Sequence, residues 1–366
     1  MSTTAPASPL AGLWHGPVVD ADVHIAPPSV EAIFPYLDEV WREFAMERGF
    51  GEGTWNATSV TNTLPPNSPI TTRADWRPDD GRPPASDLEL LNRQVLEPYG
   101  TEMAVVTCYY GIDALRHPDY AAAMASAVND WMVAEWLEAD ERLRGSLVLP
   151  AHDPVAMAAE IDRLGGHPRI RQIFLPIRSE HLYGRRTYLP VFEAAARHGL
   201  VCGLHFGGSS DGPPTPVGFP SWYMEEYAGA TQLYFSQIMS IIAEGLLQRF
   251  PSLKFAVLEG GFLWLPGIMW RLDKEWKGLR RDIPWVDRPP SSLVREHFRF
   301  SVAPVDAGPP EHMAVQIDHL GADDMLMFAT DYPHDHQRGL EELIGVLPQA
   351  TLENMMYRTA RDLYGD

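Results

Sequence analysis

The chain has 366 residues, of which 45% are hydrophobic and 21% charged, a composition typical of a folded protein with a sizeable core. Its 29 Lys and Arg against 49 Asp and Glu give a net charge of −20. A field of that sign repels nucleic acids and anionic membranes, so we expect neither as a partner.

The cysteine content and the first residues indicate where the protein works. Cys108 and Cys202 are too few for a disulfide framework or a cysteine-rich zinc site. The N-terminus lacks the basic and apolar segments of a secretory signal, and no apolar stretch reaches the roughly 18 residues of a membrane span. We therefore expect a cytoplasmic protein.

Eight short apolar runs alternate with amphipathic stretches along the chain, which is the pattern of repeated strand–helix units. Several runs lack polar alternation, as parallel strands buried on both faces do. The predicted strands are residues 18–24, 103–108, 145–149, 172–176, 200–205, 254–259, 298–303 and 325–330. The predicted helices are residues 120–140, 153–164, 189–198, 232–250 and 352–364. Eight such units predict an α/β protein, a (β/α)8 barrel of the TIM type.

The interval after the first strand is unusually long. We expect a flexible tail over residues 1–16 and one barrel domain over residues 17–366, with an insertion at about 50–90. Residues 51–84 are crowded with Pro, Asn, Thr and Gly. Long loops in compact domains often cover active sites, so this segment is either a lid or interface arm, or simple surface decoration.

The strongest local signal lies in the first strand, Val-Val-Asp-Ala-Asp-Val-His. Residues two apart share one face of a strand, so Asp20, Asp22 and His24 should point the same way. Three polar groups aimed into a barrel are costly unless they pair or bind a metal ion. Metal binding and a carboxylate–imidazole pair that caps the strand are therefore the two interpretations.

Three later strands end in side chains of the same kinds. His205 ends the fifth strand and is followed by Phe-Gly-Gly, and Glu259 ends the sixth and is followed by Gly-Gly. Asp331 follows the eighth strand, with His334 three residues on. Barrel enzymes place their active sites where the C-terminal ends of the strands meet. We expect these side chains to gather there.

Four of these residues form a mixed imidazole and carboxylate set for one divalent ion, namely Asp22, His24, His205 and Asp331. Such ligands suit Zn, Mn or Fe better than Ca or Cu(I). Asp20, Glu259 and His334 are candidates for holding a second ion. The candidate catalytic residues are Glu259, Asp331 and His334.

These motifs together resemble the amidohydrolase superfamily, and more narrowly its amidohydrolase-related branch, which includes aminocarboxymuconate-semialdehyde decarboxylase and γ-resorcylate decarboxylase. The resemblance spans about residues 17–364 and rests on Asp22-x-His24, His205 before Gly-Gly, Leu-Glu259-Gly-Gly with Trp264-Leu-Pro, and Asp331-Tyr-Pro-His334. It implies a distorted barrel of the metal-dependent hydrolase type, with a metal held by the strand-one residues, His205 and Asp331.

The resemblance implies one of two reactions on a small carboxylate-bearing or amide-bearing metabolite. In hydrolysis, Asp331 would accept a proton from metal-bound water, and Glu259 or His334 would protonate the leaving group. In non-oxidative decarboxylation, the metal would bind the substrate carboxylate and a neighbouring hydroxyl, and an acid would protonate the ring carbon. Arg178 and Arg338 are candidate substrate-binding residues that could hold a carboxylate through two hydrogen bonds; surface ion pairs are the other interpretation.

Two alternatives stay open. The decarboxylases of the branch carry a histidine where this chain has Glu259, whereas a few members with glutamate there, among them an aminoisobutyrate hydroxylase, are dinuclear non-haem oxygenases. The many carboxylates at the mouth would suit a pair of Fe or Mn ions. The second alternative is a barrel that acts as a structural subunit of such an enzyme. Oligomers are common in the branch, so we expect a homo-oligomer, with a complex between this chain and a related barrel as the other possibility.

Overall fold

The predicted barrel is confirmed in the computed structural model, which describes residues 9–48, 72–108, 111–208, 212–213, 215 and 217–365. Eight strands form one sheet in chain order, and each neighbouring pair is parallel. They are β1 (Val18–His24), β2 (Thr101–Thr107), β3 (Leu143–Leu147), β4 (Ile170–Pro176), β5 (Val201–His205), β6 (Phe255–Leu258), β7 (Phe298–Ser301) and β8 (Leu326–Met327). The Ala21 N–H donates to the Phe328 carbonyl (3.0 Å), which joins β1 to the chain that continues β8.

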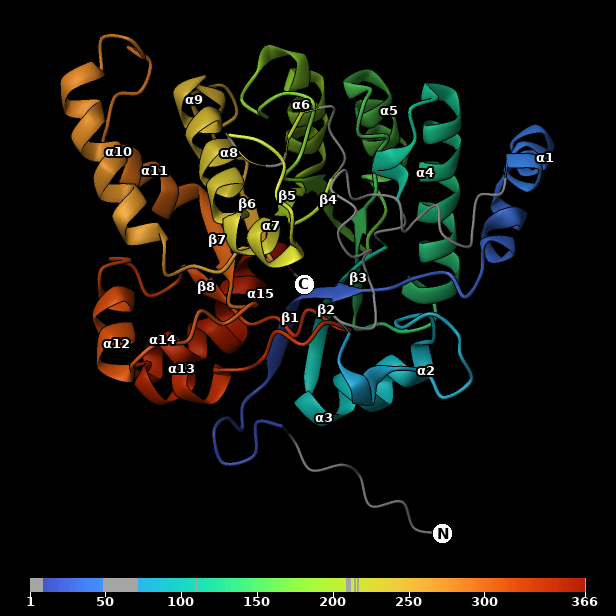
Figure 1. Cartoon of the computed structure of the whole chain (residues 1–366), viewed down its shortest axis with the longest axis horizontal. Coiled ribbons are helices and arrows are strands. Elements are labelled where there is room, and N and C mark those ends of the chain that lie inside the picture. Colours follow the sequence, from blue (N-terminus) through green and yellow to red (C-terminus); the bar gives the residue numbers. More distant parts are fainter. Residues whose placement is uncertain are drawn as a thin grey trace.

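Helices surround the strands (Figure 1). Their bounds are α1 (Glu39–Arg48), α2 (Leu88–Leu91), α3 (Glu97–Tyr99), α4 (Pro118–Met132), α5 (Pro154–Leu164), α6 (Leu189–His198), α7 (Tyr223–Gly229), α8 (Thr231–Ala243), α9 (Leu246–Arg249), α10 (Leu265–Leu279), α11 (Pro290–His297), α12 (Pro310–Asp318), α13 (Leu340–Val346), α14 (Gln349–Glu353) and α15 (Thr359–Tyr364). None of the helices in the described ranges has the length and apolar character to cross a membrane.

Local sequence signals explain where several helices begin and end. The Asp153 carboxylate caps α5 by accepting from the Val155 and Ala156 N–H groups (2.9 and 3.1 Å). Gly199 ends α6 in the left-handed region, with φ +65°. The prediction of one helix over 232–250 was wrong, because the chain turns at Gly245 (φ +75°) and separates α8 from α9.

The core has an inner part within the barrel and an outer part between strands and helices. The C-terminal helix closes the bottom of the barrel: the Tyr364 hydroxyl donates to Gln172 Oε1 (2.8 Å), and Gln172 Nε2 donates to Ser146 Oγ (2.9 Å). The bottom of the barrel is therefore filled by side chains. The opposite end, where β1, β5, β6 and β8 end, is available for a functional site.

The tail and the insertion are described only in part, because residues 1–8 and 49–71 lie outside the described residues. Leu10 is buried in the core, so the flexible tail expected over residues 1–16 does not extend that far. At the end of the insertion the Arg73 N–H donates to the Pro333 carbonyl (2.9 Å), and the Trp76 ring contacts that of Tyr332 at 5.1 Å. This end therefore packs on the loop after β8, whereas a lid over residues 51–84 stays a prediction.

Candidate active site

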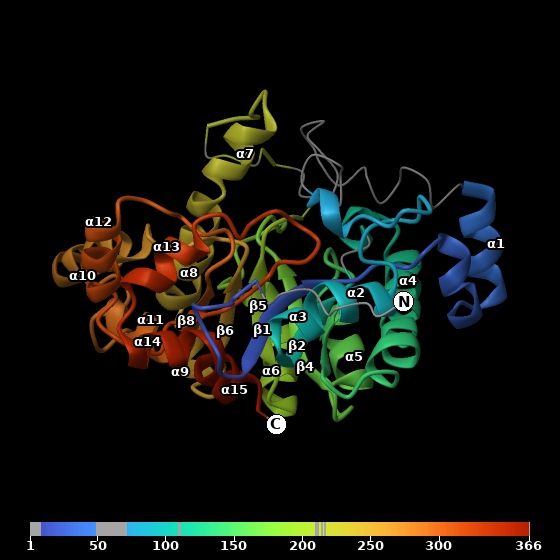
Figure 2. The ribbon, with the colours of Figure 1, turned by 90° about the horizontal axis from the view of Figure 1, so that it is seen from below.

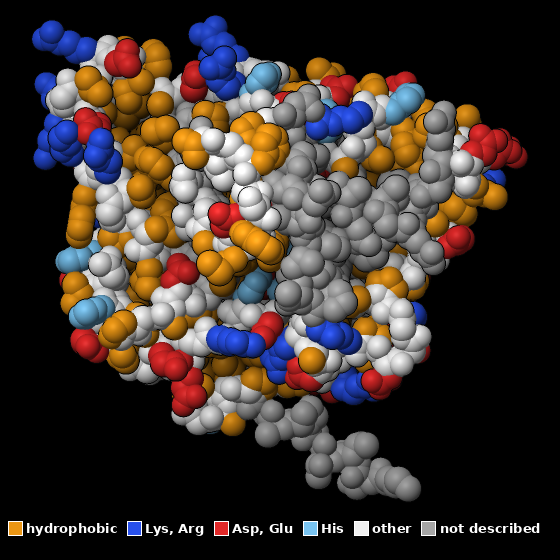
Figure 3. Space-filling model, viewed as in Figure 1, with side chains coloured by type: hydrophobic (Ala, Val, Ile, Leu, Met, Phe, Trp, Pro, Cys, Tyr) orange, Lys and Arg blue, Asp and Glu red, His pale blue; other side chains and the backbone are white. Residues whose placement is uncertain are grey.

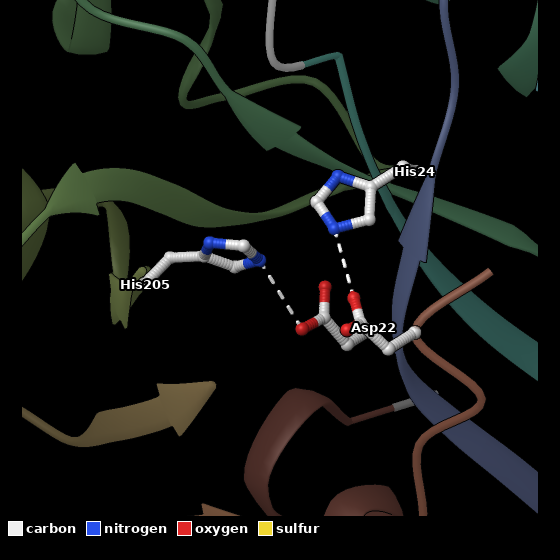
Figure 4. Close-up of side chains that lie close together, drawn as sticks. Asp22, His24 and His205 are labelled. Atoms are coloured by element: carbon white, nitrogen blue, oxygen red, sulfur yellow. Dashed lines mark hydrogen bonds and ion pairs between the residues drawn. The ribbon is translucent and has the colours of Figure 1, made fainter. Parts of the chain in front are cut away.

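Four buried side chains meet at the mouth of the barrel: Asp22 and His24 from β1, His205 from the end of β5, and Asp331 from the loop after β8. Their ligand atoms all lie within 4.8 Å of one another. His24 Nε2 lies 2.9 Å from Asp331 Oδ1, and His205 Nε2 lies 3.2 Å from Asp22 Oδ2. In Figure 4 both imidazole rings point towards the carboxylate oxygens. The structure thus brings together all four residues of the predicted metal set.

The hydrogen bonds of His205 indicate what this group is built to hold. His205 Nδ1 lies 2.8 Å from the Phe206 carbonyl, which can only accept, so the ring proton belongs on Nδ1. In the neutral ring, which is the form that binds a cation, the lone pair of Nε2 then faces the Asp22 carboxylate. Within the described part of the chain, neither Asp22 oxygen nor His205 Nε2 has a hydrogen-bond partner. A divalent cation between them would satisfy all three buried atoms, so the residues fit a metal.

Backbone strain marks two of the site residues. Asp331 has φ +53° and Glu259 has φ +54°, in the left-handed region that residues other than glycine seldom adopt. Such strain persists where the surrounding structure fixes it, and it is concentrated at functional sites. The turn after β5 instead uses Gly208 (φ +105°), where a Cβ would lie 2.2 Å from the Arg178 carbonyl oxygen.

A second group of potential ligands adjoins the first and consists of Glu259, Asp331 and His336. It shares Asp331 with the four-residue group, and its ligand atoms also lie within 4.8 Å of one another. Glu259 therefore lies at the barrel mouth beside the four-residue group. The expected partners for a second ion need correction, because His336, and not Asp20 or His334, completes this group in the described residues.

Asp20 has a different set of contacts. Its carboxylate accepts from the Thr330 N–H (2.9 Å), the Thr330 hydroxyl (2.6 Å) and the Asp22 N–H (3.3 Å), so both oxygens are already hydrogen-bonded. The side chain is fully buried and ties β1 to the chain after β8. Burial raises the pKa of Asp20 to about 7, against the hydrogen bonds to Thr330, which lower it.

This shift predicts a pH dependence of folding stability. Between pH about 4 and 7 the native state holds a proton on Asp20 that the unfolded state has lost, so stability falls as pH rises through that window. The contribution is up to about 1.4 kcal/mol per pH unit. Urea unfolding of wild type and Asp20→Asn at several pH values tests it, because the difference between them should change across the window. A difference independent of pH would contradict this role of Asp20.

His334 lies beside the metal group without joining it. Its ring is edge-on to His24 (5.0 Å between centroids) and stacked on His336 (5.5 Å, 20°). Burial lowers the pKa of His334 to about 3, which keeps the ring neutral. The Nδ1 atom is buried and has no hydrogen-bond partner among the described residues. A catalytic role for His334 stays a prediction.

The electrostatics of the mouth follow from several carboxylates packed against imidazoles. Burial favours a neutral His205, but the charges of Asp22 and the other carboxylates prevail and raise its pKa to about 10. Burial likewise opposes ionisation of Asp331, yet the nearby His334 and His336 and the hydrogen bonds to Asp331 hold its pKa well below its usual range. Burial, assisted by the charge of Asp331, raises the pKa of Glu259 to about 7. Glu259 can therefore carry a proton at neutral pH.

The two arginines predicted to bind substrate have other partners. Arg178 is buried and forms an ion pair with the buried Glu226 of α7. Arg338 lies on the surface, with a side chain 87% exposed, and pairs with Asp335 (2.8 Å). The geometry supports a surface ion pair for Arg338 and a structural link to α7 for Arg178, and it gives no support to either as a carboxylate-binding residue.

The Arg178 pair makes a stability prediction. Glu226→Ala leaves the guanidinium buried without its counter-charge, which should cost about 3–5 kcal/mol of unfolding free energy. The double variant Arg178→Met/Glu226→Leu removes both charges and should recover most of that loss. Urea unfolding of the three proteins measures it. A single variant as stable as wild type would mean that the pair contributes nothing to the fold.

The sequence reasoning missed two contributors to the mouth, His336 and Tyr227. The Tyr227 hydroxyl donates to Glu259 Oε1 (3.1 Å) and lies 3.0 Å from His336 Nε2. His336 belongs to the same Tyr-Pro-His-Asp-His stretch as His334, so the motif contained it. No sequence signal pointed to Tyr227, which comes from α7.

Comparison with known proteins agrees with this geometry. A family model described as amidohydrolase matches residues 19–365. The chain belongs to this amidohydrolase family. The decarboxylase orsB of Emericella nidulans is 27% identical to this amidohydrolase over 279 residues, which cover 66% of this chain and 76% of that protein.

Solved structures share the barrel of this amidohydrolase at low sequence identity. A 5-carboxyvanillate decarboxylase from Novosphingobium aromaticivorans, complexed with manganese and 4-hydroxy-3-methoxy-5-nitrobenzoic acid, is 16% identical with a TM-score of 0.69, and the match covers 99% of both chains. A dihydroxybenzoic acid decarboxylase from Polaromonas sp. JS666, with bound manganese and 2-nitroresorcinol, is 16% identical with a TM-score of 0.65. That match covers 96% of this chain and 97% of the other. These likenesses establish the fold.

Proposed function

We propose that this amidohydrolase is a metal-dependent, non-oxidative decarboxylase of a small aromatic carboxylate. The observation that carries the proposal is the buried group of Asp22, His24, His205 and Asp331 at the barrel mouth, with Glu259 beside it. The activities named for the relatives above support decarboxylation over hydrolysis, the other reaction compatible with the sequence.

The donor set favours a divalent ion of borderline character. Two imidazoles and two carboxylates suit Mn or Zn, and the two relatives with bound manganese support Mn as the first choice. When bound, such an ion would supply Lewis-acid polarisation of substrate oxygens. In this proposal the substrate carboxylate reaches the metal group directly, because Arg178 is paired with Glu226 and Arg338 with Asp335.

Glu259 is the proposed acid. When the bond between the ring carbon and the carboxylate carbon breaks, carbon dioxide leaves. The electron pair of that bond stays on the ring carbon. That carbon then needs a proton, which Glu259 can hold at neutral pH because its pKa is raised to about 7. The Tyr227 hydroxyl fixes one Glu259 oxygen, and water restores the proton after product leaves.

A second candidate function is oxidation at a pair of metal ions. The observation that favours it is the second group of Glu259, Asp331 and His336, which shares Asp331 with the first. A carboxylate between two such groups can bridge two ions, and oxygen-rich mixed ligation suits Fe or Mn. Such an oxygenase requires two metal ions per chain and consumes molecular oxygen. The proposed decarboxylase needs neither a second ion nor oxygen.

The experiment that separates these functions compares reactions under argon and under air. The Mn²⁺-loaded chain is incubated with 2,6-dihydroxybenzoate and with 5-carboxyvanillate, and carbon dioxide, dissolved oxygen and products are followed. Decarboxylation predicts equal carbon dioxide release under both gases and none from EDTA-treated protein. Arg338→Ala should behave as wild type because its side chain is exposed. Product formation only under air would instead support the oxygenase.

A homo-oligomer or a complex with a related barrel stays a prediction. Hydrophobic side chains appear over α7 in Figure 3, and Trp222 and Met224 are 73% and 78% exposed. A second copy of this chain is the proposed occupant of that surface. Light scattering on the purified chain tests it: a mass that falls to the monomer value in Trp222→Ser/Met224→Ser supports it, and a monomeric wild type contradicts it.

A further inference from the structure

A pocket lies on the outside of the barrel, between α6 and α9 (Figure 1). Its volume is about 420 Å³, the size of pockets that hold small metabolites. The lining comes from the loop before α6 (Gly184, Arg186), from α9 (Leu246, Arg249) and from the loop after α10 (Trp285). No residue of the barrel mouth contributes to it, and in Figure 2 α9 lies near the end of the barrel opposite α7. This pocket is therefore separate from the candidate active site.

The pocket is positively charged on a chain that is strongly negative. Arg186 and Arg249 line it, and an adjoining hollow of about 420 Å³ shares Arg186 and adds Arg185 and His181. Glu244 is the single carboxylate in either lining, so three guanidinium groups face one acid, whereas the whole chain has 49 acids and 29 bases. In salt, charges within about 10 Å dominate the local potential. The pocket should therefore attract small anions although the net charge is −20.

These arginines lack the partners that other arginines of the chain have. Within the described residues, the side chains of Arg185, Arg186 and Arg249 form neither an ion pair nor a hydrogen bond. Arg142, by contrast, pairs with Asp140. Guanidinium groups bind phosphate oxygens through pairs of parallel hydrogen bonds, and the N–H donors of this pocket are available for such bonds.

Trp285 gives the pocket a flat aromatic wall. Its indole N–H donates to the Ala243 carbonyl (2.7 Å), which fixes the orientation of the ring. Gly245 allows the ring to lie close to the backbone, because a Cβ at that position would come within 2.6 Å of a ring carbon. Trp285 is nevertheless 48% exposed, so part of the ring can stack on a planar group.

The loop before α6, which carries two of the arginines, is held against α8 by buried contacts. The Tyr183 N–H donates to Gln237 Oε1 (2.9 Å), and Gln237 Nε2 donates to the Ile177 carbonyl (2.8 Å). Gly184 packs so closely on α8 that a Cβ would lie 2.2 Å from the Ser240 carbonyl oxygen. The backbone of the pocket is thus already in place, which lowers the entropic cost of binding a ligand.

We propose that this pocket binds a metabolite that carries both phosphate and a planar ring, the chemistry of a nucleoside diphosphate. Arg186 and Arg249 bind the phosphate oxygens, Arg185 adds positive charge beside them, and the planar ring stacks on Trp285. Neither the metal nor decarboxylation takes part in this binding. The proposal therefore goes beyond the proposed function, and each can fail without the other.

Isothermal titration of the full chain with ADP, without added divalent metal, measures this binding. ADP should bind at one site per chain with a Kd below about 1 mM. Pyrophosphate supplies the charge without the ring, and adenosine supplies the ring without the charge. Each should bind about tenfold or more weakly than ADP, because stacking or charge-assisted hydrogen bonds are lost.

Variants of the lining residues assign the binding to this pocket. Arg186→Gln/Arg249→Gln should weaken ADP binding by about 100-fold, since each lost charge-assisted hydrogen bond costs about tenfold. Trp285→Ala should weaken ADP binding by about tenfold and leave pyrophosphate binding unchanged. The matched control is Arg338→Gln/Arg358→Gln, which removes the same charge from exposed arginines and should bind ADP within about twofold of wild type.

Three results would overturn the proposal. The first is a wild-type chain that does not bind ADP. The second is an equal loss of binding in the two double-arginine variants, which would mean attraction by overall charge and not by this pocket. The third is a loss of ADP binding after EDTA treatment, which would place the phosphates on a metal at the barrel mouth.

Discussion

Asp331→Asn is expected to abolish turnover and to remove the bound metal. Asp331 is the residue shared by both ligand groups, and its carboxylate contacts His24 and His336. An amide removes the negative charge that would balance the cation, so metal affinity should fall by more than the about 10–100-fold typical of changes outside the ligand set. Elemental analysis after dialysis, together with carbon dioxide release, measures both effects.

Asp335→Asn is the control for this variant. Asp335 lies four residues along the same loop and pairs at the surface with Arg338 (2.8 Å). It should retain metal and turnover. If Asp331→Asn kept its metal at the wild-type level, the buried group at the mouth would not be the metal site.

Glu259→Gln is expected to lower kcat by about 10²–10⁴-fold while the chain keeps its metal. The amide preserves the shape and the bond from Tyr227 but has no proton of the required acidity to deliver. In wild type the protonated form of Glu259 decreases as pH rises through about 7, so kcat should decline above that pH. In Glu259→Gln this decline should disappear.

Measurement of kcat against pH for wild type, Glu259→Gln and Glu244→Gln checks this role. Glu244 lies at the end of α8 and should have no effect when changed. If Glu259→Gln turned over at the wild-type rate, Glu259 would not be the acid. If instead it lost one of two bound ions, the dinuclear interpretation would replace the one proposed above.

The barrel and most of the site were predictable from sequence because each depends on local patterns. The apolar run at 18–24 is β1 to the residue, and the C-terminal ends of parallel strands meet by necessity, which brought His205 and Glu259 to the mouth. The alternation of side chains along β1 predicted Asp22 and His24 on the same face, and their ligand atoms lie within 4.8 Å of each other.

What could not be predicted depends on geometry outside the strands. Whether His334 or His336 joins Glu259 and Asp331 depends on the loop after β8, which begins with Asp331 at φ +53°. The alternation of side chains along a strand does not apply in that loop. The hydrogen bonds of Asp20 to Thr330 join residues 310 positions apart, and sequence alone offers no signal for them. Tyr227 belongs to α7, which stands above the mouth (Figure 2), and its hydroxyl donates to Glu259 Oε1 (3.1 Å).

The central claim is that the buried group at the mouth holds one divalent ion, and metal content per chain tests it most directly. Elemental analysis of protein purified without added metal or chelator should find close to one Mn or Zn ion per chain, which Asp22→Ala or His205→Ala should remove. A chain without bound metal would contradict the account. Two ions including Fe, with one lost in Glu259→Ala, would replace decarboxylation with oxidation at a dinuclear centre.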